Sequence, residues 1–138
     1  MTKVSMTTRI PVSPEKIWDL IGQFNALPDW HPAVEKSALE EGGQVRRLSL
    51  VGGGSIVERL EKIDEEQHVY RYSILESPLP VTDYTAELRV RPDKDGDGCT
   101  IEWSSEFEPQ GASAGDATEV IQDIYQAGFD NLKKLFGG

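Results

Sequence analysis

Hydrophobic and polar residues alternate at every second position through most of the chain. The first such segment, Lys3 to Ile10, predicts a half-buried strand. From about residue 34 to residue 109, further segments of this kind follow one another, separated by turn-forming sequences such as Gly52-Gly53-Gly54 and Ser77-Pro78-Leu79-Pro80. Strands that are spaced so regularly, without helices between them, predict an antiparallel meander.

Helical signals occur on either side of this meander. After the first strand, Ser13-Pro14-Glu15 provides a helix cap, a first-turn proline and a favourable acidic residue, and Gly22 is expected to end the helix. The segment Phe24 to Val34 is aromatic and interrupted by prolines, which predicts one or two helical turns.

The C-terminal segment predicts the longest helix. Asp116-Ala117-Thr118-Glu119 resembles a capping box, apolar residues from Ala117 to Leu135 recur at helical spacing, and Gly137 is expected to end the helix. We expect about 19 residues, or roughly 28 Å, which is enough to cross the face of a sheet.

Hairpin pairing assigns the strand residues to two faces. If Leu50 pairs with Ile56 across the Gly52 turn, the pairing of each later hairpin assigns every second residue to the same face; we call this alternation the parity of a strand. A slip of one residue would move all side chains of a strand to the other face. One face collects charged residues such as Arg59, Arg71 and Glu87. The other face is largely apolar and needs a cover, which only the C-terminal helix is large enough to provide. Its members are Leu48, Leu50, Ile56, Leu60, Tyr70, Tyr72, Ile74, Tyr84, Ala86, Leu88, Val90, Ile101, Trp103, Ser105 and Phe107.

Composition and charge restrict the partners. The 138 residues suit a single domain, and their net charge of −10 disfavours nucleic acid and anionic membrane surfaces. No apolar run is long enough to span a membrane, the N-terminus lacks a signal-peptide pattern, and Cys99 is the only cysteine. We therefore expect a cytoplasmic protein without membrane insertion. The sequence does not specify an oligomeric state.

Several stretches resemble the helix-grip superfamily of START and birch-pollen-allergen-like (SRPBCC) proteins, and within it the bacterial polyketide cyclase/dehydrase-like branch. The most specific is Leu27-Pro28-Asp29-Trp30-His31-Pro32, and Pro14 to Trp18, Ile56 to Leu60, Tyr70 to Ile74 and the Trp103 strand also match. The resemblance implies one α+β domain over residues 1–138: a roughly seven-stranded antiparallel sheet wrapped around the C-terminal helix, with two short helices after strand 1. It also implies a cavity between sheet and helix for a small hydrophobic molecule, but no single activity.

Two polar residues are the candidate catalytic groups. Strand parity directs Glu58 inward, where burial without a cationic partner would raise its pKa and suit a general acid or a hydrogen-bond anchor. The alternative is a glutamate that reaches solvent or binds loop backbone. His31 lies in the loop expected at the cavity mouth and could exchange a proton near neutral pH, or simply bind a backbone carbonyl.

Aromatic residues are the candidate ligand contacts, because apolar rings with polar tips suit an aromatic or polyketide-like molecule. A filled core would use the same residue types, and for Trp30 we favour that role. The candidates are Trp30, Tyr72, Tyr84, Trp103, Tyr125 and Phe129.

Neither a metal site nor a cofactor is predicted. Asp93 to Gly98 imitates the start of a calcium loop, but the position for its bidentate glutamate is Ser104, so we predict a hairpin turn. Gly52 to Ser55 lacks the lysine of a phosphate loop and is also a turn. His31 and His68 have no metal-ligand spacing to Cys99.

Two functions from different classes fit these features. The favoured one is a binder or carrier of a small hydrophobic or aromatic, lipid- or polyketide-like molecule. The alternative is a cofactor-independent polyketide cyclase or dehydratase in which Glu58 and His31 act as acid–base groups. The absence of a recognisable triad, metal site or nucleotide loop favours binding.

Overall fold

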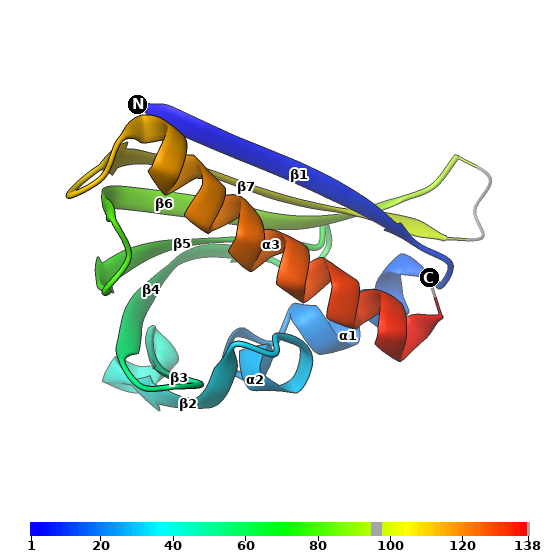
Figure 1. The fold of residues 1–138 in the computed structure, drawn as a ribbon. Coiled ribbons are helices and arrows are strands. Elements are labelled where there is room, and N and C mark those ends of the chain that lie inside the picture. The colour runs from blue at the N-terminus through cyan, green and yellow to red at the C-terminus, as the bar shows by residue number, and fades with distance from the viewer. Residues whose placement is uncertain (95–97, 138) are drawn as a thin grey trace.

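The computed structural model describes residues 1–94 and 98–137 of the chain. Seven strands, two α-helices of at least two turns and several short helical segments follow one another in the predicted order (Figure 1). They are β1 (Thr2–Ile10), α1 (Pro14–Ile21), η1 (Phe24–Ala26), α2 (Leu27–Trp30), β2 (Val34–Glu40), η2 (Glu41–Gly43), β3 (Val45–Leu50), β4 (Ser55–Asp64), β5 (Val69–Glu76), β6 (Val81–Pro92), β7 (Cys99–Pro109) and α3 (Ala114–Phe136).

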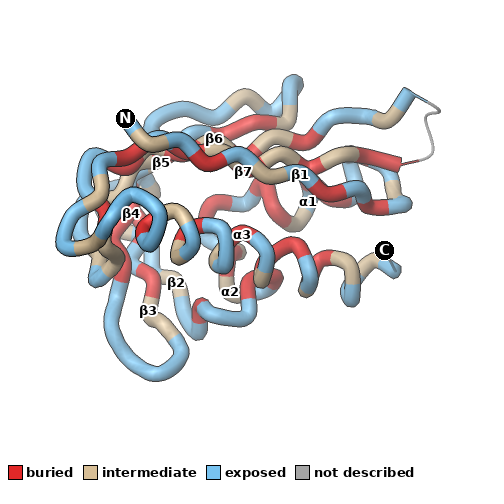
Figure 2. Tube along the Cα trace, turned by 45° about the horizontal axis from the view of Figure 1, so that its top comes forward, coloured by how far each residue is buried: buried red, intermediate tan, exposed pale blue. Residues whose placement is uncertain are grey.

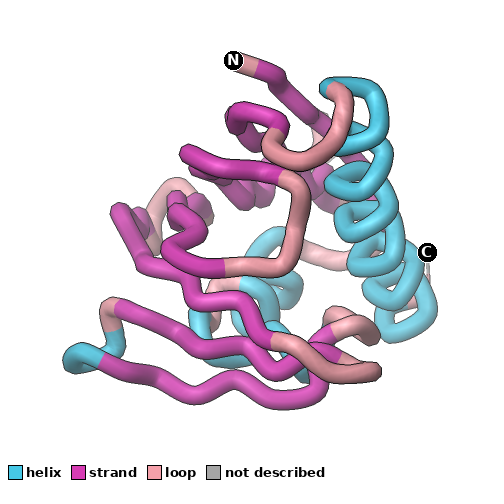
Figure 3. The backbone as a smooth tube through the Cα atoms, turned by 60° about the vertical axis from the view of Figure 1, so that its left-hand side comes forward, coloured by secondary structure: helices cyan, strands magenta, loops and turns pink. Residues whose placement is uncertain are grey.

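One antiparallel sheet contains all of these strands, in the order β1-β7-β6-β5-β4-β3-β2. Strands β2 to β7 form the meander, and β1 pairs with β7, which places the N-terminal strand beside the last one. The sheet curves around one side of α3 (Figures 1 and 3). This is the α+β helix-grip arrangement, so the predicted fold class is confirmed.

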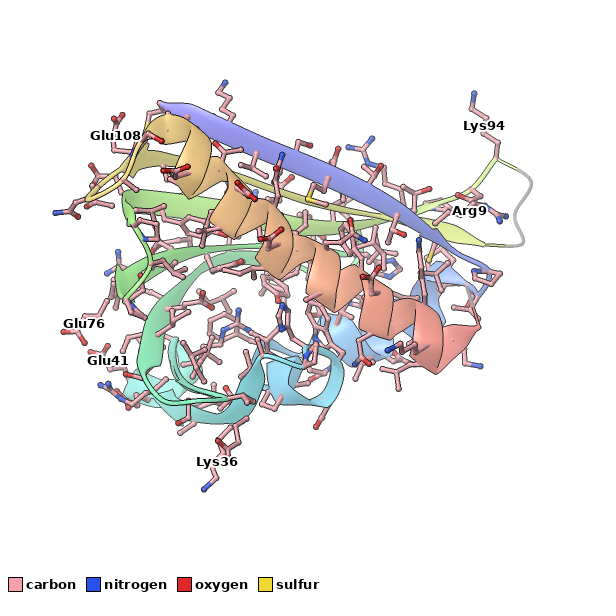
Figure 4. All side chains as sticks on the ribbon, viewed as in Figure 1. Arg9, Lys36, Glu41, Glu76, Lys94 and Glu108 are labelled. Atoms are coloured by element: carbon pink, nitrogen blue, oxygen red, sulfur yellow. The ribbon has the colours of Figure 1, made fainter. Side chains whose placement is uncertain are left out.

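The two faces of the sheet have the predicted sidedness. Buried residues alternate with partly or fully exposed ones along the central strands (Figure 2), and the apolar face meets α3. On the opposite face, opposite charges pair across strands, as between Arg91 and Glu102 at 3.0 Å. Charged side chains such as Lys36, Glu76 and Glu108 project away from the body of the protein (Figure 4).

One predicted register is wrong, and its correction matters for the site. Leu48, rather than Leu50, pairs with Ile56, so β3 is shifted by two residues relative to our pairing. The turn is longer than expected because Gly52, Gly53 and Gly54 all adopt positive φ angles. A shift of two residues preserves the faces but changes the partners. As a result, Arg46 lies opposite Glu58, where we expected Leu60.

The helix ends follow their sequence signals with one exception. Ser13 accepts a hydrogen bond from Lys16 N as the cap of α1, and Gly137 ends α3 in the left-handed conformation, as predicted. Helix α3 begins earlier than we expected, because the side chain of Ser113, not Asp116, accepts the first-turn N–H. The helix therefore has 23 residues instead of about 19.

The predicted hairpin turn between β6 and β7 lies partly outside the described residues. Asp93 N–H donates to Gly98 O at 3.0 Å, so the two ends of the segment meet. The intervening residues Asp95, Gly96 and Asp97 are not described.

Candidate functional site

A cavity of about 210 Å³ lies between the sheet and the N-terminal half of α3. Ile121 and Ile124 close it on the helix side, and the loop at His31 to Val34 lines another side. Its sheet wall comes mainly from β3, β4 and β5, with Tyr84 of β6 and Trp103 of β7 at one side. The apolar residues of this wall are Leu48, Leu50, Ile56 and Ile74.

The charged group in the cavity wall is Glu58, which forms a buried ion pair. Arg46 Nε donates to Glu58 Oε1 at 2.8 Å and Arg46 Nη2 lies 2.6 Å from the same oxygen. The Arg46 side chain is 1% exposed and that of Glu58 is 7% exposed. A buried ion pair is tolerated only when its remaining hydrogen-bonding groups find partners, so the surroundings of Arg46 decide whether this one is stable.

Arg46 is held by further groups. Its Nη1 donates to the carbonyl of Phe24, and its guanidinium lies 4.1 Å from the centre of the Phe24 ring and 5.2 Å from that of Tyr72. Burial opposes the charge on Arg46, but the Glu58 carboxylate, together with Tyr70 and Tyr72, more than offsets this and raises the Arg46 pKa. Arg46 is therefore charged at every relevant pH.

This pairing changes the expectation for Glu58. Burial raises the Glu58 pKa, and the charge and hydrogen bond of Arg46 oppose that rise. We had considered a carboxyl without a cationic partner, and the structure supplies one. With a permanent cation 2.6 Å away, Glu58 is ionised at neutral pH and acts as a hydrogen-bond acceptor.

His31 lies in the cavity wall with both ring nitrogens engaged. Nε2 donates to the carbonyl of Ile124 at 2.7 Å, and Nδ1 accepts from Ala33 N–H at 3.2 Å. These bonds fix the neutral tautomer with its proton on Nε2. Burial lowers the His31 pKa, and the bond to Ile124 offsets part of this shift. A proton on Nδ1 would face the Ala33 N–H, so the geometry opposes acid–base cycling.

Three of the aromatic candidates form a hydrogen-bonded wall. Trp103 Nε1 donates to the Tyr72 hydroxyl at 3.0 Å, and the Tyr72 and Tyr84 hydroxyls lie 3.4 Å apart. Tyr84 continues the chain through a short contact with the Tyr125 hydroxyl. Burial is the main cause that raises the pKa values of Tyr72, Tyr84 and Tyr125, so all three remain protonated.

The remaining aromatic candidates lie outside the cavity lining, contrary to our expectation for Tyr125 and Phe129. Trp30 is 1% exposed and packs 5.5 Å from Trp103, which agrees with a core role. Tyr125 stacks on Trp103 at 4.2 Å, and Phe129 packs against the same ring. The absence of a side chain at Gly128 lets Trp30 and Trp103 approach α3 closely, which fills this region.

Arg46 is a residue of the site that the sequence pattern did not predict. Its position has the same parity as Leu48 and Leu50, which was the available signal for an inward orientation. The shifted register concealed its partner. Because Glu58 points inward, a positively charged side chain on the neighbouring strand that points to the same face, such as Arg46, is its expected partner.

Other reactive chemistry is not evident in the described part of the chain. Within residues 1–94 and 98–137, no group of three His, Cys, Asp or Glu side chains is arranged to hold a metal ion. Cys99 is buried, and burial raises the pKa of its thiol to about 11, so it is a poor nucleophile. Among the same residues, no helix combines the length and apolar character needed to cross a membrane.

Comparison with known proteins identifies the family. Residues 1–137 match the family described as "Polyketide cyclase / dehydrase and lipid transport". The chain belongs to this family. The predicted membership of the polyketide cyclase-like branch of the START-like superfamily is thus confirmed.

Individual relatives agree with this assignment. The structure of the protein XoxI from Bacillus cereus is 38% identical, covers 99% of this chain and 96% of its own, and superimposes with a TM-score of 0.96. A START superfamily protein from Mycobacterium smegmatis shares the fold at a TM-score of 0.81 and 15% identity, with coverage of 98% and 97%.

A curated relative is a receptor. The chain is 25% identical over 128 residues to the abscisic acid receptor PYL7 of Arabidopsis thaliana, an alignment that includes 86% of this chain. The chain spans 59% of the length of that receptor.

Proposed function

We propose that this protein binds a small, largely apolar ring compound in the cavity between the sheet and α3, as a binder or carrier. The observation that carries this proposal is the cavity itself, which has a volume of about 210 Å³ and a mainly aliphatic and aromatic wall. Isolated polar points in such a wall serve to orient a ligand. The family description, which includes lipid transport, supports the same class of function.

The size of the cavity limits the ligand. An apolar cavity of roughly 150 Å³ is large enough to bind benzene, whereas sites for drug-sized molecules begin at about 300 Å³. The observed volume of about 210 Å³ lies between these values. It favours a single ring with short substituents or a fused pair of rings over a long acyl chain.

The state of the polar groups favours binding over catalysis. His31 uses both ring nitrogens in structural hydrogen bonds, and Glu58 is ionised against Arg46. A general acid must carry a transferable proton, and a general base must be able to accept one near the operating pH. His31 lacks this freedom, and Arg46 holds Glu58 in its ionised form, so we assign both groups to shaping and orienting the site.

A direct test is to identify what the protein carries. Protein purified from its native host would be extracted with organic solvent, and the extract analysed by mass spectrometry. We expect a stoichiometric ring compound, or uptake of one from a panel of aromatic compounds and lipids by the empty protein. Consistently empty preparations together with no uptake from the panel would contradict the proposal.

A cofactor-independent cyclase or dehydratase is the second candidate, supported by the family description and by a carboxylate in the cavity wall. The variants Glu58→Gln and His31→Ala would be assayed on a polyketide-like substrate. A loss of turnover in a folded variant, with substrate binding retained, would favour the enzyme. Unchanged turnover in both variants would remove these residues from the mechanism.

A further inference from the structure

The cavity wall offers a ligand two different polar contacts, a hydrogen-bond acceptor and a hydrogen-bond donor. The acceptor is Glu58 Oε2. Both contacts of Arg46 go to Oε1, and among the described residues no hydrogen bond reaches Oε2. Glu58 lines the cavity and retains 7% exposure of its side chain, and the oxygen that Arg46 does not contact is the one available to a ligand there.

The donor is the hydroxyl of Tyr72. An indole N–H can only donate, so Trp103 Nε1 fixes the Tyr72 oxygen as its acceptor at 3.0 Å. The Tyr72 proton is then free for another partner. The Tyr84 oxygen lies 3.4 Å away, well beyond the usual O–H···O distance of about 2.7–2.8 Å, and Tyr84 is engaged more closely with Tyr125. Among the described residues, the acceptor for the Tyr72 proton is therefore a long contact to Tyr84, which a closer ligand oxygen could replace.

These two contacts lie on one wall. Leu60 pairs with Tyr72 and Glu58 pairs with Ile74, so Glu58 and Tyr72 are diagonal neighbours on β4 and β5. Such neighbours point to the same face, and their Cα atoms are about 7–8 Å apart. A single ligand in the cavity can therefore reach both side chains.

We propose that the ligand is a ring compound that carries both a hydroxyl group and a carbonyl group. Its hydroxyl donates to Glu58 Oε2, and its carbonyl accepts from the Tyr72 hydroxyl, while the ring lies between Ile74 and Ile121. This assignment rests on the proposed binding function and deepens it by naming the polar groups that are recognised. Ligands without these groups would leave the carboxylate oxygen and the phenol unpaired in a desolvated wall.

Four probes of similar shape separate the two contacts. These are ethylbenzene, 4-ethylphenol, acetophenone and 4-hydroxyacetophenone, which carry neither group, the hydroxyl, the carbonyl and both groups, respectively. Dissociation constants would be measured by calorimetry. We expect the hydroxyl to strengthen binding by about tenfold or more, since its acceptor is charged, and the carbonyl by about fivefold.

Amino-acid substitutions test which side chain is responsible for each increase in affinity. In Tyr72→Phe, the advantage of acetophenone over ethylbenzene should disappear, whereas Tyr70→Phe, which removes a buried hydroxyl outside the cavity lining, should preserve it within about twofold. In the double variant Arg46→Met/Glu58→Leu, which leaves no lone buried charge, the advantage of 4-ethylphenol should disappear while ethylbenzene still binds.

The outcomes distinguish this inference from the proposed function. Binding of all four probes with advantages that vanish only in the matching variants would support both. Binding of all four without any dependence on hydroxyl or carbonyl groups would overturn the inference and leave the apolar binder intact. If none of the probes binds to the folded protein, both the inference and the proposed site are contradicted.

Discussion

The interface between the sheet and α3 has a packed half and a hollow half. In the packed half, Tyr125, Gly128 and Phe129 of α3 fit closely against aromatic rings such as Trp103, and Leu132 is fully buried. In the hollow half, Ile121 and Ile124 of the same helix face the cavity. The two halves share one helix and one sheet face. What separates them is the size and shape of the facing side chains, not their hydrophobicity.

Some of the polar groups divide in a similar way. Around the packed half, Asn131 Nδ2 donates to the carbonyl of Trp30 at 2.9 Å, although the buried Ser105 Oγ has no partner among the described residues. At the hollow half, Glu58 and Tyr72 retain capacity for a partner. The contrast indicates that the packed half stabilises the fold and that the hollow half is available for a ligand.

The largest effect is expected from breaking the ion pair beneath the hollow half. Arg46→Met leaves Glu58 as an isolated buried carboxylate, which should lower the free energy of unfolding by about 3–5 kcal/mol. Chemical denaturation would measure the change. The double variant Arg46→Met/Glu58→Leu should recover most of the loss, because no lone charge remains. Equal losses in the single and double variants would show that the pair matters for its shape rather than its charge.

A methyl group in the packed half should be costly. A Cβ atom at position 128 would lie 3.0 Å from His31 Cδ2 and from Trp30 Cζ3, within rings that cannot easily move. We expect Gly128→Ala to lower the free energy of unfolding by about 1–3 kcal/mol despite the better helix propensity of alanine.

Gly115 of the same helix provides the matched control. A Cβ there would meet no atom closer than Ser113 Oγ at 4.0 Å, so Gly115→Ala should be neutral or stabilising by up to about 1 kcal/mol. If both alanine substitutions stabilise the protein, the packed half is looser than its contacts indicate.

Enlarging one residue in each half tests the contrast directly. Leu132→Phe in the packed half should cost about 1–3 kcal/mol through overpacking. Ile121→Phe should change the free energy of unfolding by less than about 1 kcal/mol, because its ring can occupy the cavity, and should abolish binding of 4-ethylphenol. Thermal unfolding and calorimetry would report the two effects. Equal costs at both positions would contradict the division into halves.

The smallest effect concerns pH. The folded-state pKa of His31 is lowered, so the unfolded chain binds more protons as the pH falls below the ordinary value of 6.5. The free energy of unfolding should therefore decrease as the pH falls below this value, by at most about 1.4 kcal/mol per pH unit.

Glu58 also affects the pH dependence, because its raised pKa acts in the opposite direction at acidic pH. The contribution of His31 is therefore obtained by measuring the free energy of unfolding against pH for the wild type and for His31→Gln and taking the difference. The difference in unfolding free energy should fall between pH 7 and pH 5. A constant difference would show that His31 titrates normally in the folded state.

The sequence predicts the fold well because its signals are local. Period-two alternation assigns the strand faces, Ser13 and Gly137 mark helix ends, and the parity of Glu58 directs it into the interface. The site depends on the register between strands and on how tightly side chains fill the interface, and the alternation of apolar and polar residues determines neither. A turn with three positive-φ glycines shifted β3 by two residues and so concealed the partner of Glu58. The cavity could not be derived either, since a filled and a hollow interface use the same residue types.

The most direct test of the hollow half as a binding site is a methyl-resolved NMR titration with 4-ethylphenol, with intermolecular nuclear Overhauser contacts recorded at saturation. We predict contacts from the probe to methyl groups of Leu48, Ile74 and Ile121, and none to Leu132. Contacts to Leu132, or saturation of the protein surface without contacts to Ile74 and Ile121, would contradict it.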